Sequence, residues 1–171
     1  LPAPGAADTA ATRWLEVDAE DIRRLSAEHQ GEGSAAQRMQ HLRDFVAGYI
    51  SDKTLAVGYA SALETAQSRR GDCTEHAVLL AALGRAAGIP TRVVSGVAYA
   101  EAFAGKDRVF VPHAWVVAYV DGHWRSFDAA LAGFDSGHIA FTVDNGDPAA
   151  FYASLNWLGR LQIKDVEVRA P

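Results

Sequence analysis

The sequence has a single cysteine in 171 residues and no long hydrophobic run. One cysteine excludes an internal disulfide framework and leaves the redox compartment undecided. No stretch approaches the roughly 20 apolar residues of a transmembrane helix, and residues 1–12 lack the charged and apolar regions of a secretory signal. A net charge of -5 and a pI near 5.6 provide no basic stripe. We therefore expect no nucleic-acid partner and no transmembrane segment in this chain.

Length and composition indicate one globular domain. With 49% hydrophobic and 22% charged residues, the chain can bury a substantial core. Residues 1–17, rich at first in Ala, Pro and Gly, are predicted to form an N-terminal linker, and residues 18–171 a single domain. The sequence starts without methionine, so we expect it to be part of a longer polypeptide.

The stretch around Cys73 has the pattern of a buried helix with a polar start. The positions that follow are small and apolar with leucines at helical spacing, and a glycine and a proline end the run. Asp72 and Glu75 form a capping-box pattern, which predicts that the helix begins at the cysteine. Unpaired N–H groups of the first turn favour a thiolate, and Arg69 and Arg70 add positive charge nearby.

A predicted hairpin supplies a base for this cysteine. Residues 109–120 are dense in Val, Phe, Trp and Tyr, and the Asp-Gly that follows is a strong turn signal between antiparallel strands. His113 lies eight residues before this turn and Asp128 six after it, so we expect the two side chains near each other at the open end of the hairpin. Asp128 can then accept the Nδ1 proton of His113 and direct the other ring nitrogen toward Cys73.

Three ordered blocks, GDCTEHAVLLAALGRAAGIPTRVVSGVAY, HAW and FDAAL, resemble the catalytic core of the transglutaminase-like superfamily, which includes papain-like cysteine enzymes and bacterial transglutaminase-like domain proteins. The resemblance covers roughly residues 35–169. It implies that Cys73 is the nucleophile, His113 the base and Asp128 the orienting acid of a catalytic triad. Pro112 and Ala129 depart from the family pattern, at positions that affect strand geometry and remove no reacting group.

The pattern of elements and the resemblance predict an α+β fold with a papain-like, transglutaminase-like core. In it, Cys73 begins a buried helix that packs on an antiparallel β-sheet carrying His113 and Asp128. Helices are predicted at residues 18–29, 34–50, 59–67, 73–87 and 148–158. Strands are predicted at residues 14–17, 91–99, 109–120, 134–143 and 162–168 and in the segment ending near Asp128, with residues 100–108 as a loop.

Three further side chains are candidates for supporting the chemistry. Gln67 lies six residues before Cys73, the spacing at which papain-like enzymes place an oxyanion-hole glutamine; the backbone N–H of Cys73 is an alternative donor. His76 is predicted to pack beside the cysteine, and Trp115 either walls the site or packs in the sheet. The resemblance adds His138 as a supporting candidate.

No metal or cofactor is predicted. A zinc site formed by Cys73, His76 and His113 is one alternative, but the trio lacks a second cysteine or an H-x-x-x-H pair. No calcium-binding loop of the Asp-x-Asp-x-Asp-Gly type occurs in the sequence.

The predicted chemistry is acyl transfer on a protein, peptide or amide substrate. Cys73 attacks a carbonyl, the helix N-terminus holds the oxyanion, and water or a second amine resolves the thioester. If water resolves the thioester, the protein is a protease or amidase; if an amine does, it is a transglutaminase. The resemblance to bacterial members favours hydrolysis. The alternative is a catalytically inactive interaction module of a larger protein. We expect a periplasmic or other extracytoplasmic location rather than a cytoplasmic one.

Overall fold

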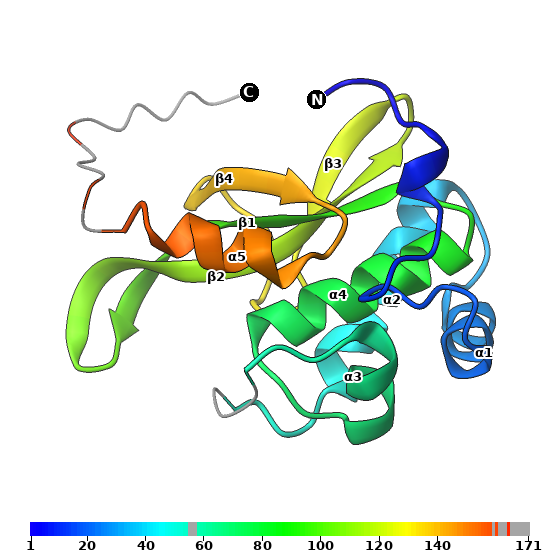
Figure 1. The fold of residues 1–171 in the computed structure, drawn as a ribbon, viewed down its shortest axis with the longest axis horizontal. Helices are drawn as coiled ribbons and strands as arrows, with labels where there is room; N and C mark the ends of the chain where they lie inside the picture. The colour runs from blue at the N-terminus through cyan, green and yellow to red at the C-terminus, as the bar shows by residue number, and fades with distance from the viewer. Residues whose placement is uncertain (55–57, 159, 161–163, 165–171) are drawn as a thin grey trace.

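A computed structural model describes residues 1–54, 58–158, 160 and 164. Helices fill the first half of the chain and antiparallel strands most of the second half, as the predicted α+β class requires (Figure 1). In this part of the chain, no helix has both the length and the apolar character needed to cross a membrane. The elements are the 3₁₀ helix η1 (Ala6–Asp8), α1 (Glu20–His29), α2 (Ala35–Tyr49), α3 (Ala62–Ser68), α4 (Cys73–Ala86), β1 (Thr91–Phe103), β2 (Lys106–Val120), β3 (His123–Phe127), β4 (His138–Asp144) and α5 (Pro148–Leu155).

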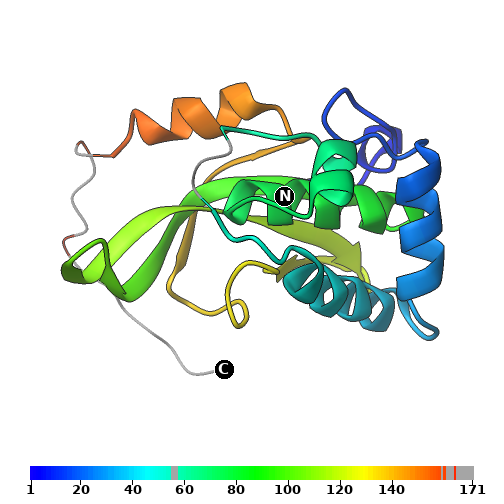
Figure 2. The same ribbon diagram turned by 90° about the horizontal axis from the view of Figure 1, so that it is seen from below.

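The strands form one antiparallel sheet in the order β3-β2-β1-β4. β1 and β2 pair along almost their whole length, from Thr91 opposite Ala118 to Phe103 opposite Lys106. β3 pairs only with the end of β2, and β4 only with the middle of β1. The far part of the β1–β2 hairpin therefore extends away from the rest of the domain (Figure 2).

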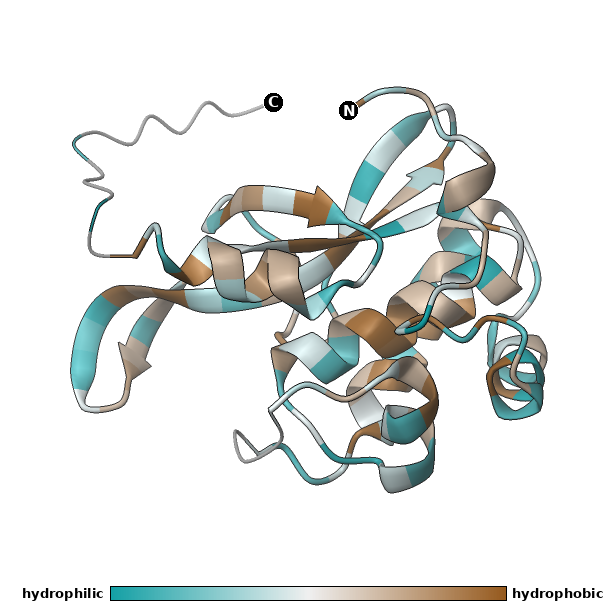
Figure 3. Cartoon of the chain, in the orientation of Figure 1, coloured by the Kyte–Doolittle hydropathy of each residue, from teal (hydrophilic) through white to brown (hydrophobic). Residues whose placement is uncertain are grey.

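Helix α4 is the centre of the domain. It contacts α1, α2 and α3 as well as β1 and β2, and every residue from position 74 to 85 is buried. Figure 3 shows α4 apolar over most of its length, whereas α1 and the tip of the β1–β2 hairpin are mainly hydrophilic. A helix that is apolar around its circumference is stable only when it is covered on all sides, which explains the three helices and the sheet around α4.

The predicted cap of α4 is confirmed, and it is a buried one. Asp72 accepts a hydrogen bond from the Thr74 N–H at 2.9 Å, and Glu75 Oε2 accepts one from the Asp72 N–H at 2.9 Å. Glu75 is fully buried, and its Oε1 also accepts from the Ala60 N–H at 2.9 Å. Gly71 has a φ of 149°, and a Cβ there would lie 2.3 Å from the Glu75 side chain. Glycine thus permits the close approach that fixes Cys73 in the first turn.

Helix α2 holds the segment that follows β3. Nε of Arg43 donates to the backbone oxygen of Asp128 at 2.5 Å, and Nη2 donates to the backbone oxygen of Leu131. The Arg43 side chain is 14% exposed, so these hydrogen bonds are largely shielded from water. They connect positions more than 80 residues apart in the sequence and anchor the backbone that carries the Asp128 carboxylate.

Residues 100–108, predicted to be a loop, are instead the end of the β1–β2 hairpin. β1 continues to Phe103 and β2 begins at Lys106, so Ala104 and Gly105 alone make the turn. Their φ angles are 48° and 76°, as a two-residue type I′ turn requires. The prediction was wrong because alanine rarely adopts a positive φ, so the composition did not indicate this turn.

The segment before α1 also differs from the prediction. The edge strand expected at residues 14–17 is wrong: Leu15 is fully buried, and its N–H donates to Thr12 Oγ1 at 3.0 Å within a turn. Asp8 pairs with Arg92 of β1 at 2.7 Å. The composition of residues 1–17 indicated a linker, yet these residues make tertiary contacts with the domain.

Several helices and strands begin or end at residues other than the predicted ones. α1 begins at Glu20 with Ala19 as its N-cap, because Asp18 pairs with Arg23 instead of capping the helix. β4 begins at His138 rather than at residue 134, and α5 ends at Leu155 rather than at residue 158. Of the strand predicted at residues 162–168, all but residue 164 lies outside the described residues.

Replacing Glu75 by glutamine should lower the free energy of unfolding by about 1–3 kcal/mol, because one amide oxygen cannot replace both accepting carboxylate oxygens in a buried site. The matched control is Glu64→Gln, since Glu64 makes the same capping contact with Ser61 at an exposed position and should cost about 0.5 kcal/mol. Urea unfolding measures both losses. Equal losses of unfolding free energy in the two variants would contradict a larger stabilising role for the buried Glu75 cap.

Replacing Arg43 by methionine should loosen the segment after β3, because both backbone carbonyls lose a charged donor. We expect faster amide hydrogen exchange at Ala130 and Leu131, measured by NMR. Arg38→Met is the control: Arg38 is on the same helix and donates to the backbone oxygen of Ala87 at 3.1 Å. Unchanged exchange in the Arg43 variant would show that the arginine does not hold this segment.

Candidate active site

β2 and the segment after β3 bring His113 and Asp128 together. Nε2 of His113 lies 2.8 Å from Oδ2 of Asp128, and the two residues are 4% and 1% exposed. The hairpin spacing predicted this proximity, and the contact confirms it. The ring nitrogen is different from the predicted one, because Nε2 rather than Nδ1 contacts the carboxylate. Nδ1 of His113 is therefore the nitrogen left for other partners.

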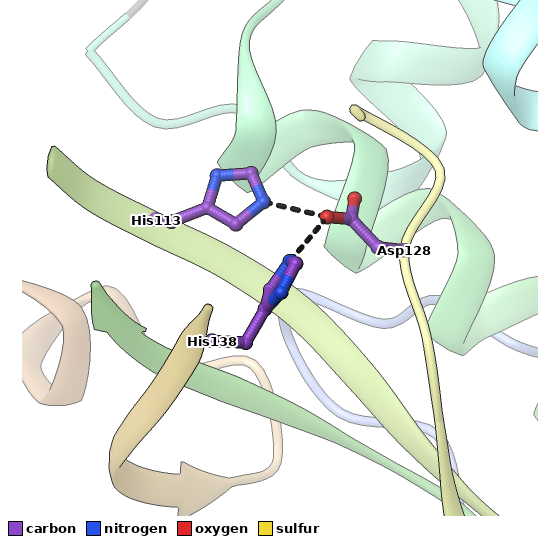
Figure 4. Close-up of side chains that lie close together, drawn as sticks. All are labelled: His113, Asp128 and His138. Atoms are coloured by element: carbon purple, nitrogen blue, oxygen red, sulfur yellow. Dashed lines mark hydrogen bonds and ion pairs between the residues drawn. The ribbon is translucent and has the colours of Figure 1, made fainter. Parts of the chain in front are cut away.

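The Asp128 carboxylate accepts hydrogen bonds on both oxygens. Oδ1 accepts from the backbone N–H groups of Ala130 at 2.8 Å and Leu131 at 3.2 Å. Oδ2 contacts Nε2 of His113 and also, at 3.0 Å, Nε2 of His138 (Figure 4). Burial opposes ionisation, but the hydrogen bonds from the two histidines hold the pKa of Asp128 well below its ordinary value. The group is therefore a fixed carboxylate.

Cys73 shares a pocket with His113. The cysteine is the first residue of α4 and is partly exposed. It lines a pocket of about 370 Å³ together with His113 and His76. A hydrogen bond from the backbone of Ala114 links the sulfur to β2, one residue from His113. Within the described part of the chain, the structure contains no hydrogen bond between Cys73 and His113 themselves.

The thiol environment disfavours an isolated thiolate. Burial raises the pKa of Cys73 to about 12, and the charge of Asp72 raises it as well, while the hydrogen bond from Ala114 opposes this rise. A thiolate at Cys73 therefore needs a compensating positive charge, which an imidazole that takes the thiol proton can provide.

The two arginines before Cys73 do not provide this charge. Arg70 pairs with Asp52 at 2.7 Å, and the Arg69 guanidinium lies over the Tyr49 ring, 4.5 Å from its centroid. The prediction that these arginines favour the thiolate is wrong, because tertiary partners direct both side chains elsewhere.

Of the four supporting candidates, His138 contacts Asp128, and His76 and Trp115 also lie near the pair. His76 is 2% exposed and lines the pocket, and its Nδ1 lies 2.5 Å from the backbone oxygen of Asp72. Burial lowers the pKa of His76, which favours the neutral form of its ring. Trp115 is 2% exposed and stacks beside His113 with ring centroids 6.0 Å apart. It packs with Val94 and Val117 in the sheet and is not part of the pocket wall.

The remaining candidate, Gln67, does not join the site. Its side chain is exposed on α3, and its nitrogen donates to Asp21 at 3.5 Å. The predicted oxyanion role was wrong because α3 ends at Ser68 and Arg69 adopts a positive φ of 56°, which turns the chain before Cys73. The backbone N–H of Cys73 remains the alternative donor, because the Thr74 N–H already bonds to the Asp72 side chain.

Among the described residues, one group of three side chains could hold a metal ion. Its members are His113, Asp128 and His138, whose ligand atoms lie within 4.8 Å of one another. Both Nε2 atoms already contact the same carboxylate oxygen, so a metal would have to displace two hydrogen bonds. The predicted alternative of Cys73, His76 and His113 is not such a group.

The wall of the pocket is mainly apolar. Three large side chains at its rim, Tyr99, Phe103 and Leu131, are 39%, 46% and 42% exposed. Lys53 and Asp72 supply charge on the wall. The pocket therefore offers an apolar surface beside the thiol, which suits an apolar group of a ligand. This wall was not predicted from the sequence, because residues 100–108 were expected to form a loop and not the end of a hairpin.

Arg43 was also not predicted. An arginine on the polar face of an amphipathic helix is ordinary, and its two carbonyl partners lie more than 80 residues away. No local pattern could have indicated this contact.

Comparison with solved structures finds similar proteins. A candidate cysteine protease from Cytophaga hutchinsonii matches with a TM-score of 0.68 and 25% identity over 83% of this chain and 47% of that protein. A TGase matches with a TM-score of 0.50 and 20% identity, over 77% of this chain and 36% of that one. The periplasmic domain of TgpA from Pseudomonas aeruginosa, bound to ethylmercury, matches with a TM-score of 0.49 and 24% identity, over 71% and 46%.

The chain thus spans less than half the length of each of these proteins. No curated protein sequence matches it. The family model of the transglutaminase-like superfamily matches residues 23–129, more than half of the chain, and this range includes Cys73, His113 and Asp128. With this match and the fold, the chain belongs to the transglutaminase-like superfamily.

Proposed function

We propose that this domain is a cysteine enzyme that transfers the acyl group of a peptide or carboxamide bond, with Cys73, His113 and Asp128 as its catalytic triad. The observation that carries the proposal is the buried His113–Asp128 contact at the wall of the pocket that also holds the Cys73 thiol. Membership of the superfamily and the likeness to a candidate cysteine protease support the same class of enzyme.

The first half of the reaction forms a thioester. Nδ1 of His113 takes the thiol proton, and the sulfur of Cys73 attacks the substrate carbonyl carbon. The carbonyl oxygen becomes negative and accepts a hydrogen bond from the backbone N–H of Cys73 at the start of α4. The C–N bond then breaks, and the leaving amine takes the proton from His113. Asp128 keeps the Nε2 proton of the ring in place throughout.

The second half of the reaction releases the acyl group. Water gives a proton to His113 and attacks the thioester carbon, the C–S bond breaks, and the proton returns to the sulfur of Cys73. An amine that enters the same position would give transamidation instead.

A catalytically inactive interaction module is the second candidate function. It is favoured by the raised pKa of Cys73, since a thiol that stays protonated is a poor nucleophile. It differs from the enzyme proposal in one measurable property, the dependence of thiol reactivity on His113.

We also propose that the domain is part of a longer polypeptide and works in an extracytoplasmic compartment. Its match to less than half the length of longer proteins of known structure supports the first proposal.

Iodoacetamide labelling of Cys73 tests the catalytic pair. At pH 6 we expect the wild-type thiol to react at least about tenfold faster than in His113→Ala, because burial keeps a thiol without this base protonated. His123→Ala is the matched control, since His123 is exposed on β3 and contacts the backbone of Asp121. Equal rates in all three proteins would support the interaction module.

The pocket wall predicts a preference for a substrate with a bulky apolar residue beside the reacting carbonyl. Peptidyl chloromethyl ketones that carry leucine there should inactivate the enzyme faster than matched reagents with aspartate. Phe103→Ser should lower this preference by about tenfold, because it removes an apolar surface of the pocket.

Tyr152→Ser is the control for Phe103→Ser. Tyr152 is 48% exposed on α5 and is not among the residues that line the pocket. If Phe103→Ser leaves the preference unchanged, the wall does not select the substrate.

A further inference from the structure

The His138 side chain contacts the Asp128 carboxylate although the two residues lie at opposite edges of the sheet. Asp128 follows β3 at one edge, His138 is the first residue of β4 at the other, and the chain between them crosses the sheet. Figure 4 shows the His138 ring pointing at the same carboxylate oxygen as the His113 ring. The His138 side chain is only 2% exposed, so water cannot substitute for the contacts that its ring makes.

Both ring nitrogens of His138 face hydrogen-bond acceptors. Nε2 lies 3.0 Å from Oδ2 of Asp128. Nδ1 lies 3.1 Å from a carboxylate oxygen and 3.2 Å from the backbone oxygen of Asp135, while the Asp135 N–H is farther away at 3.4 Å. A neutral imidazole carries one N–H and can donate from only one nitrogen. The three contacts to oxygen acceptors are satisfied together when His138 is protonated on both nitrogens, whereas the longer contact from the Asp135 N–H would need a Nδ1 without a proton.

The surroundings of the His138 ring fit a positive charge. The ring packs against Trp115, with centroids 5.2 Å apart, and against Phe134, with centroids 4.6 Å apart. The titratable groups that face it are the carboxylates of Asp128 and Asp135 and the ring of His113, 5.6 Å away. Burial lowers the pKa of His138, but the hydrogen bonds to the two carboxylates outweigh burial and raise it.

We propose that His138 is a positioning residue, an imidazolium that holds the Asp128 carboxylate in the orientation in which it orients His113. This inference rests on the proposed function, because it concerns the geometry of the triad. Oδ2 of Asp128 is shared by two rings, and the backbone N–H groups of Ala130 and Leu131 occupy Oδ1. Without His138, Oδ2 loses one of its two partners and the carboxylate can rotate away from His113.

Because His138 is charged only when it is protonated, its stabilising contribution depends on pH. Because the folded-state pKa of His138 is raised, its stabilising contribution is fully present below the ordinary value of about 6.5. The contribution is lost as the pH rises through the folded-state pKa. The deprotonated ring keeps one N–H and must give up its bond to Asp128 or to Asp135.

NMR of the histidine rings in the wild-type protein tests the charge directly. At pH 6 we expect two slowly exchanging ring N–H protons on His138, one on each nitrogen. A single ring N–H at this pH would overturn the imidazolium. This measurement needs no reactivity of Cys73, so its result is independent of the proposed function.

Two variants test the positioning role. His138→Phe keeps an aromatic ring but removes both donors, whereas His138→Gln keeps one uncharged donor near the position of Nε2. We expect His138→Phe to slow iodoacetamide labelling of Cys73 at pH 6 by about 10- to 100-fold, toward the rate of His113→Ala. His138→Gln should recover most of the wild-type rate. Thermal unfolding of both variants separates loss of rate in a folded protein from failure to fold.

The outcomes distinguish the two proposals. If His138→Phe labels at the wild-type rate while His113→Ala is slow, the positioning role is overturned and the proposed function stands. If wild type and His113→Ala label alike, the proposed function fails and the positioning role fails with it. The difference in Tm between wild type and His138→Gln should also shrink as the pH rises from 6 to the alkaline range, and a constant difference would contradict the charged state.

Discussion

The buried carboxylate of Asp128 is the group on which the site depends. Its backbone oxygen is held by Arg43 from α2, and its side chain contacts His113 of β2 and His138 of β4. A helix and two strands therefore converge on one residue that belongs to none of them. A carboxylate in such a place is costly to bury unless several donors compensate, and these donors are supplied by parts of the chain that only the folded domain brings together.

The same principle explains why Cys73 is not an ordinary reactive thiol. The cap of α4 needs Asp72 and the fully buried Glu75, and both carboxylates lie close to the sulfur. The groups that fix the position of the thiol thus also oppose its ionisation. In the proposed mechanism this conflict is resolved by His113, which takes the proton and becomes the positive charge that the site otherwise lacks. Reactivity is then confined to the geometry in which base and thiol face each other.

The β1–β2 hairpin connects the site to the substrate surface. The middle of this hairpin carries His113, opposite Gly96, and the part nearer the turn carries Tyr99 and Phe103 on the pocket wall. Gly96 allows the close approach of β4, because a Cβ there would lie 2.1 Å from the backbone oxygen of Ile139. The register shift at this glycine precedes the pairing of Ala98 with His138. The position of the second imidazole is thus a consequence of how β4 pairs with β1.

The sequence by itself determined the features that depend on neighbours in the chain. The cap at Asp72 and Glu75 placed Cys73 at the start of a helix, and the turn at Asp121 fixed the register that brings His113 to Asp128. Tertiary structure alone decided the charge around the thiol, the contact of Arg43 and the ring nitrogens of the two histidines. These features depend on partners far away in the sequence, and burial sets their energies, so no local pattern of residues contains them.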